Sequence, residues 1–408
     1  MGPDTVPTPI RQTAVVAAAE APAGDSDRAP ASGVRPLRLR YPALDGLRGL
    51  AIAAVVWHHS LPSARSGPLG RGYLGVPLFF ALSGFLITRL LLAERQATGD
   101  LSLGRFWLRR SLRIFPLYYV VLGGFVVRIT LLEPSDATRH FFASLPAYAS
   151  YTSNWFVPFG VPHPVWFGFA WSLSTEEQFY LWWPPLLRLT ERFGRRLAPL
   201  ALLALLAFDQ LAEHGAFAGW APAGGVWARI ATSASAAMVL GALFALALGH
   251  PHGRALARLL GARHAPLIAA LAAAALICEP AGPPILLDLA LAGLVATATL
   301  ARGRGAIVRV LTLPPLMHVG RVSYGVYLFH VPLIGLGLSW FPGLREQAWL
   351  VFVGAFSSSV AAASLSYRYL EGPLLALQER FRPALPARIE LGLAPEPLTA
   401  APQRAQGA

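Results

Sequence analysis

The sequence contains no lysine, a single cysteine, and few charged residues of either sign, 13% of 408. The lone Cys278 excludes an internal disulfide framework and a cysteine-ligated metal site. With 55% hydrophobic residues and a mean hydropathy of +0.50, the chain is too apolar for a soluble protein of this length. The composition therefore indicates a protein embedded in a lipid bilayer.

Long apolar runs recur along the chain without a long polar interval. A helix needs about 20 apolar residues to cross about 30 Å of hydrocarbon. This length predicts an all-α, polytopic membrane protein of about ten transmembrane helices. We place them near 44–62, 73–93, 112–132, 166–187, 197–213, 227–249, 265–279, 284–301, 319–340 and 347–369. The seventh and eighth are short, and a re-entrant pair is an open alternative for them.

Arginine supplies all 34 basic side chains other than histidine, and its distribution sets the predicted topology. Twenty-four arginines fall in segments that alternate with segments holding only four. Cytoplasmic loops of membrane proteins carry this excess, so both termini are predicted to be cytoplasmic. The net charge of +13 is then a topology signal, and no nucleic acid partner is expected. We predict a disordered tail over 1–40, an integral-membrane domain over 41–371 and a second disordered tail over 372–408.

Costly polar residues within the first span suggest a site. Asp45 and Arg48 are three residues apart and can pair on one helix face. His59 lies eleven residues after Arg48, about 16 Å further along the same face. An interfacial arginine beside a packing histidine is the alternative interpretation.

A basic cluster opens the third span, with Arg110 and Arg113 three residues apart. Arginine side chains bind phosphate oxygens well, so this pair is a candidate cradle for a phosphorylated cofactor such as coenzyme A. An ordinary cytoplasmic anchor would show the same spacing.

Further polar residues lie in the fourth and ninth spans. Glu176 and Glu177 are adjacent and point about 100° apart, so we expect at most one carboxyl to face His59 and the other to pair elsewhere. In the ninth span, Tyr324, Tyr327 and His330 belong to a polar stripe. Such a stripe indicates a hydrated cavity between helices.

Together these residues are distinctive, because the chain resembles the membrane acyltransferase 3 family of bacterial O-acyltransferases over nearly all of residues 41–370. The resemblance includes the arginine and histidine of the first span, with ten residues between them, and four further segments in the family's order, 75–88, 110–116, 171–180 and 323–330. Pro77 stands where the family usually has aspartate, which weakens any role for a carboxylate there. Some members carry a C-terminal hydrolase-like domain; this chain looks like a stand-alone form without one.

The resemblance implies an acyltransferase in the bacterial inner (cytoplasmic) membrane. Its donor would be acyl-CoA, most often acetyl-CoA, without a metal. Its acceptor would be a sugar hydroxyl of a surface polysaccharide, a glycolipid or a glycosylated metabolite. The residues leave the acceptor, the acyl chain length and the oligomeric state open.

Chemistry suggests roles for the matched residues. A hydroxyl loses its proton as it attacks a thioester, and histidine titrates near neutrality, so His59 is the candidate general base or, alternatively, a transient acyl carrier. Arg48, with Arg110 and Arg113, is expected to hold the phosphate end of acyl-CoA. The residues expected to bind the acceptor are Asp45, Glu176, Glu177, Tyr180, Tyr324 and His330.

A transporter is the main competing hypothesis, since intramembrane Arg, Glu and His also form proton and ion pathways. The sequence has no obvious repeated halves and no matching pair of broken helices. A purely structural role would leave the costly polar residues unexplained.

Overall fold

The computed structural model describes residues 41–61, 67–159, 161–162, 165–194, 196–217, 219, 225–279, 281–301 and 305–381. Every regular element in these ranges is a helix, which confirms the predicted all-α class. The tail expected over 1–40 and most of the one expected after 371 lie outside these ranges.

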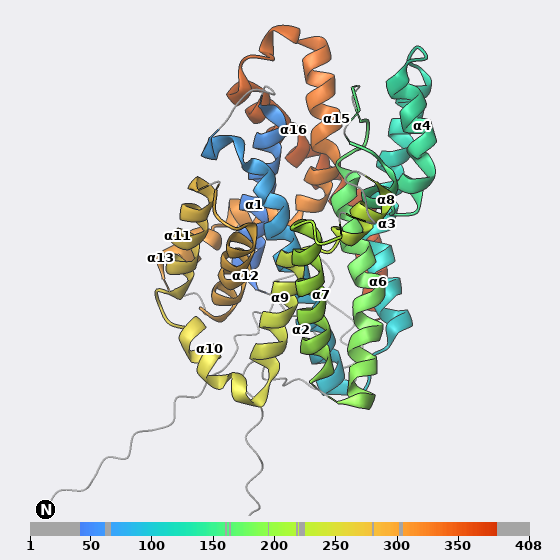
Figure 1. Ribbon diagram of the computed structural model, residues 1–408. Helices are drawn as coiled ribbons and strands as arrows, with labels where there is room; N and C mark the ends of the chain where they lie inside the picture. Colours follow the sequence, from blue (N-terminus) through green and yellow to red (C-terminus); the bar gives the residue numbers. More distant parts are fainter. Residues whose placement is uncertain are drawn as a thin grey trace, which may run out of the picture.

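The helices follow one another closely along the chain (Figure 1). The α-helices are α1 Pro42–Ser60, α2 Gly75–Thr98, α3 Leu103–Thr130, α4 Asp136–Ala149, α5 Ser153–Phe156, α6 Ala170–Phe193, α7 Leu197–Glu213, α8 Val226–Ala231, α9 Ala236–Gly249, α10 Arg254–Leu260, α11 Ala265–Cys278, α12 Pro284–Leu300, α13 Ala306–Leu311, α14 Pro314–Arg321, α15 Ser323–Trp340, α16 Ala348–Ser366 and α17 Gly372–Glu379. Short 3₁₀ turns are η1 Pro68–Gly70, η2 Gly72–Leu74, η3 Pro251–Gly253 and η4 Pro342–Leu344, and η5 Tyr367–Glu371 is a π-helix.

Several helices have the length and apolar character of membrane spans, as expected for a multi-pass membrane protein. Four qualify among the described residues, Gly72–Thr98, Leu103–Thr130, Val226–Gly249 and Ala348–Gln378. Two bent pairs add to them: α10 with α11 at 73° and α14 with α15 at 74°. Each predicted span contains a helix, but the number ten and the side of each terminus stay predictions.

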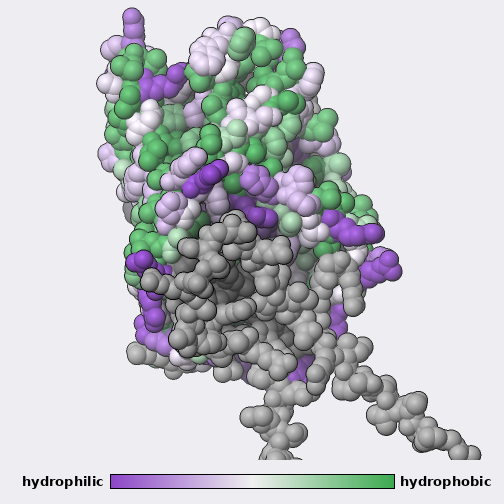
Figure 2. Space-filling model, turned by 180° about the vertical axis from the view of Figure 1, so that it is seen from behind, coloured by the Kyte–Doolittle hydropathy of each residue, from purple (hydrophilic) through white to green (hydrophobic). Residues whose placement is uncertain are grey.

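Hydrophobic side chains cover much of the face seen in Figure 2 and are interrupted by clusters of hydrophilic ones. Large apolar residues such as Val127, Ile268 and Val353 are exposed on the helices. Contiguous exposed apolar surface suits contact with lipid rather than water.

Small residues bring α2 and α9 into backbone contact. A Cβ atom added to Gly84 would lie 1.9 Å from the carbonyl oxygen of Met238. One added to Gly241 would lie 2.3 Å from the carbonyl oxygen of Ala81. Close approach through small residues is a common way for membrane helices to associate. The contact holds the part of α2 that carries Ser83 at a defined depth.

The start of α1 is held in the same way. A Cβ atom on Gly320 of α14 would lie 1.7 Å from the carbonyl oxygen of Asp45, and one on Gly46 would lie 1.9 Å from that of Leu311. In Figure 1, α1 lies in the interior, between α12 and α15. The crossing with α14 therefore fixes the height at which Arg48 enters the bundle.

The chain does not enter its predicted C-terminal tail at residue 372. Helix α17, Gly372–Glu379, follows directly and packs against α3. Proline at the first turn, Pro373, favours a helix start because its missing N–H has no partner there in any case. An arginine of α3, Arg109, donates a hydrogen bond of 3.0 Å to the carbonyl oxygen of Phe381. A helix therefore covers the first residues of the segment expected as a tail, and the domain boundary itself stays a prediction.

Candidate active site

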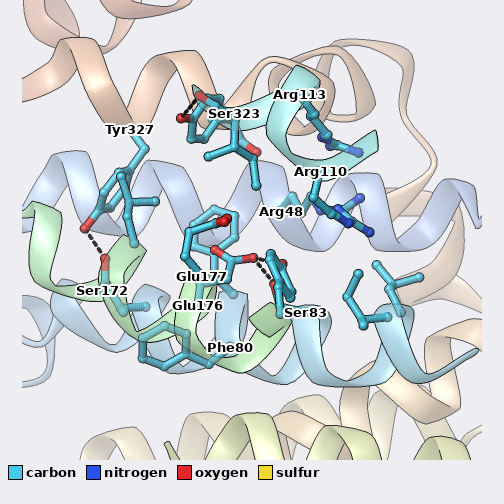
Figure 3. A pocket seen from close by; sticks show the side chains of 18 residues that line it. Arg48, Phe80, Ser83, Arg110, Arg113, Ser172, Glu176, Glu177, Ser323 and Tyr327 are labelled. Carbon is cyan, nitrogen blue, oxygen red and sulfur yellow. Dashed lines mark hydrogen bonds between the residues drawn. The ribbon is translucent and has the colours of Figure 1, made fainter. Parts of the chain in front are cut away.

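A cavity lies between α1, α2, α3, α6 and α15 (Figure 3). It brings together seven of the ten residues that sequence reasoning selected, although they come from four helices. These are Arg48, Arg110, Arg113, Glu176, Glu177, Tyr180 and Tyr324. Asp45, His59 and His330 do not line it.

Three arginines gather at one end of the cavity, where Figure 3 shows Arg48, Arg110 and Arg113 side by side. The Arg48 guanidinium donates to Asp45 over 3.0 Å, which is the predicted intrahelical pair. No ion pair with a carboxylate within 4 Å is found for Arg110 or Arg113 in the described part of the chain. Most of their N–H donors are therefore available to an anion.

The Arg110 guanidinium is oriented by aromatic rings. It lies 5.1 Å from the ring centroid of Tyr180 and 5.9 Å from that of Phe106. Cation–π contacts hold a guanidinium without using its hydrogen-bond donors. The arginine is thus positioned while its donors face the cavity.

The preceding residue, Arg109, has a different environment. Its Nη2 atom lies 2.8 Å from Oε2 of Glu94, and both side chains are buried. Adjacent helical residues point about 100° apart, which separates Arg109 from the face shared by Arg110 and Arg113. Arg109 therefore has a structural role, whereas its two neighbours line the cavity.

Glu176 is held by two hydroxyls. Its Oε1 atom accepts hydrogen bonds from Ser83 of α2 and from Tyr180 one turn along α6. The network fixes α6 against α2 beside the arginines.

Glu176 and Glu177 both line the cavity, whereas His59 does not. The cavity extends around α6 far enough to receive two side chains 100° apart. His59 lies instead at the far end of α1, where it contacts α15.

Another face of α6 is anchored by α5, which sequence reasoning did not identify. Asn154 and Gln178 exchange two amide hydrogen bonds of 2.9 Å. Gln178 also donates to the carbonyl oxygen of Tyr151, and Ser153 and Ser174 are hydrogen-bonded at 2.8 Å. Paired amides are costly to break in an apolar environment, so they fix the rotation of α6. The amide of Gln178 within an apolar span was the available signal.

Tyrosines of α15 tie the cavity to neighbouring helices. Tyr324 donates to the carbonyl oxygen of Ile114 over 2.7 Å, so its hydroxyl proton is already used. Tyr327 donates to the carbonyl oxygen of Phe169 over 2.8 Å, and its oxygen lies 2.6 Å from Oγ of Ser172 (Figure 3). Tyr327, Ser172 and Ser83 line the cavity but were not selected as site residues from the sequence.

Two imidazoles lie next to the Tyr327 end of the cavity. The ring of His330 is fully buried, 5.4 Å from the Tyr327 ring and 4.8 Å from the ring of His59. His59 itself is exposed. His330 was expected to line the cavity with Glu177, but it lies behind Tyr327, in edge-to-face contact with His59.

Apolar helices enclose a cavity with arginines at one end, and two histidines lie beyond its other end. The protein is therefore a multi-pass membrane protein with an internal polar site. The chain belongs to the acyltransferase 3 family: the family's acyltransferase domain matches residues 41–368, as the resemblance predicted.

Curated relatives agree with this assignment. The peptidoglycan O-acetyltransferase OatA of Listeria monocytogenes is 28% identical over 365 residues, 83% of this chain and 56% of that protein. The putative peptidoglycan O-acetyltransferase YrhL of Bacillus subtilis is 29% identical over 369 residues, 82% of this chain and 55% of the relative. A putative O-acetyltransferase of Staphylococcus aureus is 39% identical over 157 residues, which cover 37% of this chain and 25% of that relative. The chain thus spans just over half the length of OatA and YrhL, and no solved structure matches it.

Proposed function

We propose that the protein transfers an acyl group, in particular acetyl, from acyl-CoA to a sugar hydroxyl on the opposite side of the membrane. The observation that carries this proposal is the cavity itself. Three arginines line one end, and an exposed histidine lies beyond the other end on the same helix as Arg48.

The cationic end has the chemistry to bind the phosphates of coenzyme A. Guanidinium forks form paired, charge-assisted hydrogen bonds with phosphate oxygens. Arg110 and Arg113 retain most of their donors, and Arg48 adds a third charge. The predicted topology puts this end on the cytoplasmic side, where acyl-CoA is found.

His59 is the proposed general base. Its Nδ1 atom lies 3.0 Å from the carbonyl oxygen of Val55. A carbonyl only accepts hydrogen bonds, so Nδ1 carries the proton and Nε2 presents a lone pair. Nε2 removes the proton of the acceptor hydroxyl as its oxygen attacks the thioester carbon. The carbon–sulfur bond then breaks, and the sulfur leaves as a thiolate that takes up one proton.

The proposed acceptor is a cell-surface glycan. Two relatives bear names that specify peptidoglycan O-acetylation, and a peptidoglycan-type sugar would reach the exposed His59 from the outer face. A glycolipid or a glycosylated metabolite would present the same hydroxyl chemistry. The proposed location is the cytoplasmic membrane of a bacterium.

Reconstitution tests the proposal against the transporter hypothesis. The purified protein is placed in liposomes with acetyl-CoA labelled in the acetyl group on one side and a soluble peptidoglycan fragment on the other. Label recovered covalently on the fragment, and released by mild base as expected of an ester, supports the enzyme. Movement of an unmodified solute without label transfer would favour a transporter.

A second measurement separates the two roles considered for His59. Rapid quenching with acetyl-CoA alone, followed by mass spectrometry of the peptide containing His59, detects an acyl-histidine if one forms. A general base leaves this peptide unmodified, whereas an acyl carrier adds one acetyl group to it.

A further inference from the structure

Three imidazoles form a continuous row at the end of α1. The ring centroids of His58 and His59 are 5.3 Å apart, and those of His59 and His330 are 4.8 Å apart, each pair edge to face. At one end of the row, the ring of His58 lies beside that of Tyr73 in η2. At the other end is His330, a buried residue of α15.

All three rings are held in the same tautomer. His58 donates from Nδ1 to the carbonyl oxygen of Gly70, His59 to that of Val55 and His330 to that of Tyr327, over 3.0, 3.0 and 2.5 Å. Because each partner only accepts, each Nδ1 carries a hydrogen and each neutral ring presents its lone pair at Nε2.

The innermost ring has a lone pair with no partner. His330 is 0% exposed, and its Nε2 atom is buried without a hydrogen bond in the described part of the chain. Its ring neighbours are His59, Tyr327 and Phe169, so only His59 among them can exchange a proton easily. A buried polar atom without a partner requires an explanation.

We infer that His330 is a proton-relay residue between His59 and the leaving sulfur of the acyl donor. This inference rests on the proposed function. In this proposal the acceptor hydroxyl approaches from the exposed side of His59, and the donor's sulfur approaches from the cavity side, where His330 contacts the cavity-lining Tyr327.

The relay balances without any further reactant. Nε2 of His59 takes the hydroxyl proton as the new carbon–oxygen bond forms. Nε2 of His330 accepts that proton from His59 and passes it to the thiolate released when the carbon–sulfur bond breaks. The products are the ester and the free thiol, and both imidazoles return to their neutral forms.

The relay makes a kinetic prediction that a packing role does not. Two protons move during transfer, so the rate measured in mixtures of H₂O and D₂O should fall along a curved line as the deuterium fraction rises. In His330→Gln, which keeps a polar side chain but cannot relay, kcat should drop about 100-fold, the lower range for loss of a proton-transfer group. The remaining rate should fall along a straight line.

The control is His58→Gln, because His58 contacts the other side of His59 and is outside the relay. It should retain a kcat within about threefold of the wild type and the curved dependence. His330→Asn provides a second relay-deficient variant if His330→Gln is not recovered folded from the membrane.

Several outcomes overturn the relay. A straight line for the wild type would do so without any variant, as would a His330→Gln protein with a near-normal kcat. A slow His330 variant that keeps the curved dependence would show a packing role. Failure of the proposed function looks different, since the wild type would then transfer no label and both hypotheses would be lost.

Discussion

The guanidinium of Arg110 lies 5.1 Å from the ring centroid of Tyr180, and the hydroxyl of the same tyrosine donates to Glu176. The face of the Tyr180 ring thus positions the Arg110 guanidinium, and the hydroxyl group of the same side chain positions the Glu176 carboxyl. This arrangement keeps Arg110 and Glu176 in one cavity without letting them form an ion pair. Arg110 keeps its donors for a ligand, which leads to the first prediction.

Replacing Arg110 or Arg113 by alanine should raise the KM for acyl-CoA while changing kcat little. Each loss removes a charge-assisted hydrogen bond to phosphate, worth about 1.5–3 kcal/mol, or roughly 10- to 150-fold in affinity. Steady-state kinetics with varied acyl-CoA measures the effect. Arg139→Ala is the control, because Arg139 and Asp136 of α4 form an ion pair between two exposed side chains. An unchanged KM in the first two variants would reduce these arginines to topology anchors.

Two substitutions of Tyr180 distinguish its contact with Arg110 from its contact with Glu176. Tyr180→Phe keeps the aromatic face under Arg110 but removes the hydroxyl donor to Glu176, so KM for acyl-CoA should stay within about threefold. Tyr180→Leu also removes the cation–π contact, worth about 1–2 kcal/mol at a desolvated site, and should raise KM roughly 5- to 30-fold. Equal KM values for the two variants would show that the ring does not position the arginine.

Arg109→Ala should affect stability rather than donor binding. The change leaves the buried Glu94 carboxylate without its partner and removes a hydrogen bond to Phe381, which should cost about 3–5 kcal/mol. Thermal unfolding in detergent should show a clear decrease in Tm, whereas KM for acyl-CoA in the surviving folded protein should be normal. A raised KM at normal Tm would assign Arg109 to the donor site.

His59→Ala should abolish acyl transfer, with kcat reduced about 10²- to 10⁴-fold by loss of the general base. The side chain is exposed, and its hydrogen bond in the described part of the chain is to Val55 in the preceding turn, so membrane insertion should be preserved and Tm should change little. His264→Ala, an exposed histidine before α11, serves as the matched control. Label transfer at the wild-type rate by His59→Ala would remove this residue from the mechanism.

Much of the architecture follows from the sequence because a bilayer imposes simple rules. The length of each apolar run predicted a span, and each predicted span contains a helix. The cost of burying charge identified Arg48, Arg110 and the two glutamates, which line one cavity in the structure. The α5–α6 contact was not predicted, since the amide pair of Asn154 and Gln178 forms only in the folded bundle.

Other features could not be predicted from single residues. Ser83 and Ser172 cost little to bury, because a serine can bond to a carbonyl of its own helix, so nothing in the sequence separates cavity serines from packing ones. The position of His330 along its span was clear, but its contact with His59 depends on how α15 is rotated against α1. The helix after residue 371 depends on Arg109, whose partners lie far away in the sequence.

Gly84 connects helix packing to the site, and a single methyl group tests the connection. In Gly84→Ala the added Cβ would lie 1.9 Å from the carbonyl oxygen of Met238, so α2 and α9 must move apart. Overpacking of this kind costs about 1–3 kcal/mol. Because Ser83 directly precedes Gly84, the movement also pulls its hydroxyl away from Glu176. We therefore expect kcat to fall together with Tm. Gly104→Ala on α3 is the matched control, since a Cβ there meets no atom within 4 Å. If Gly84→Ala lowers neither Tm nor kcat, the α2–α9 contact is looser than described and does not set the position of Ser83.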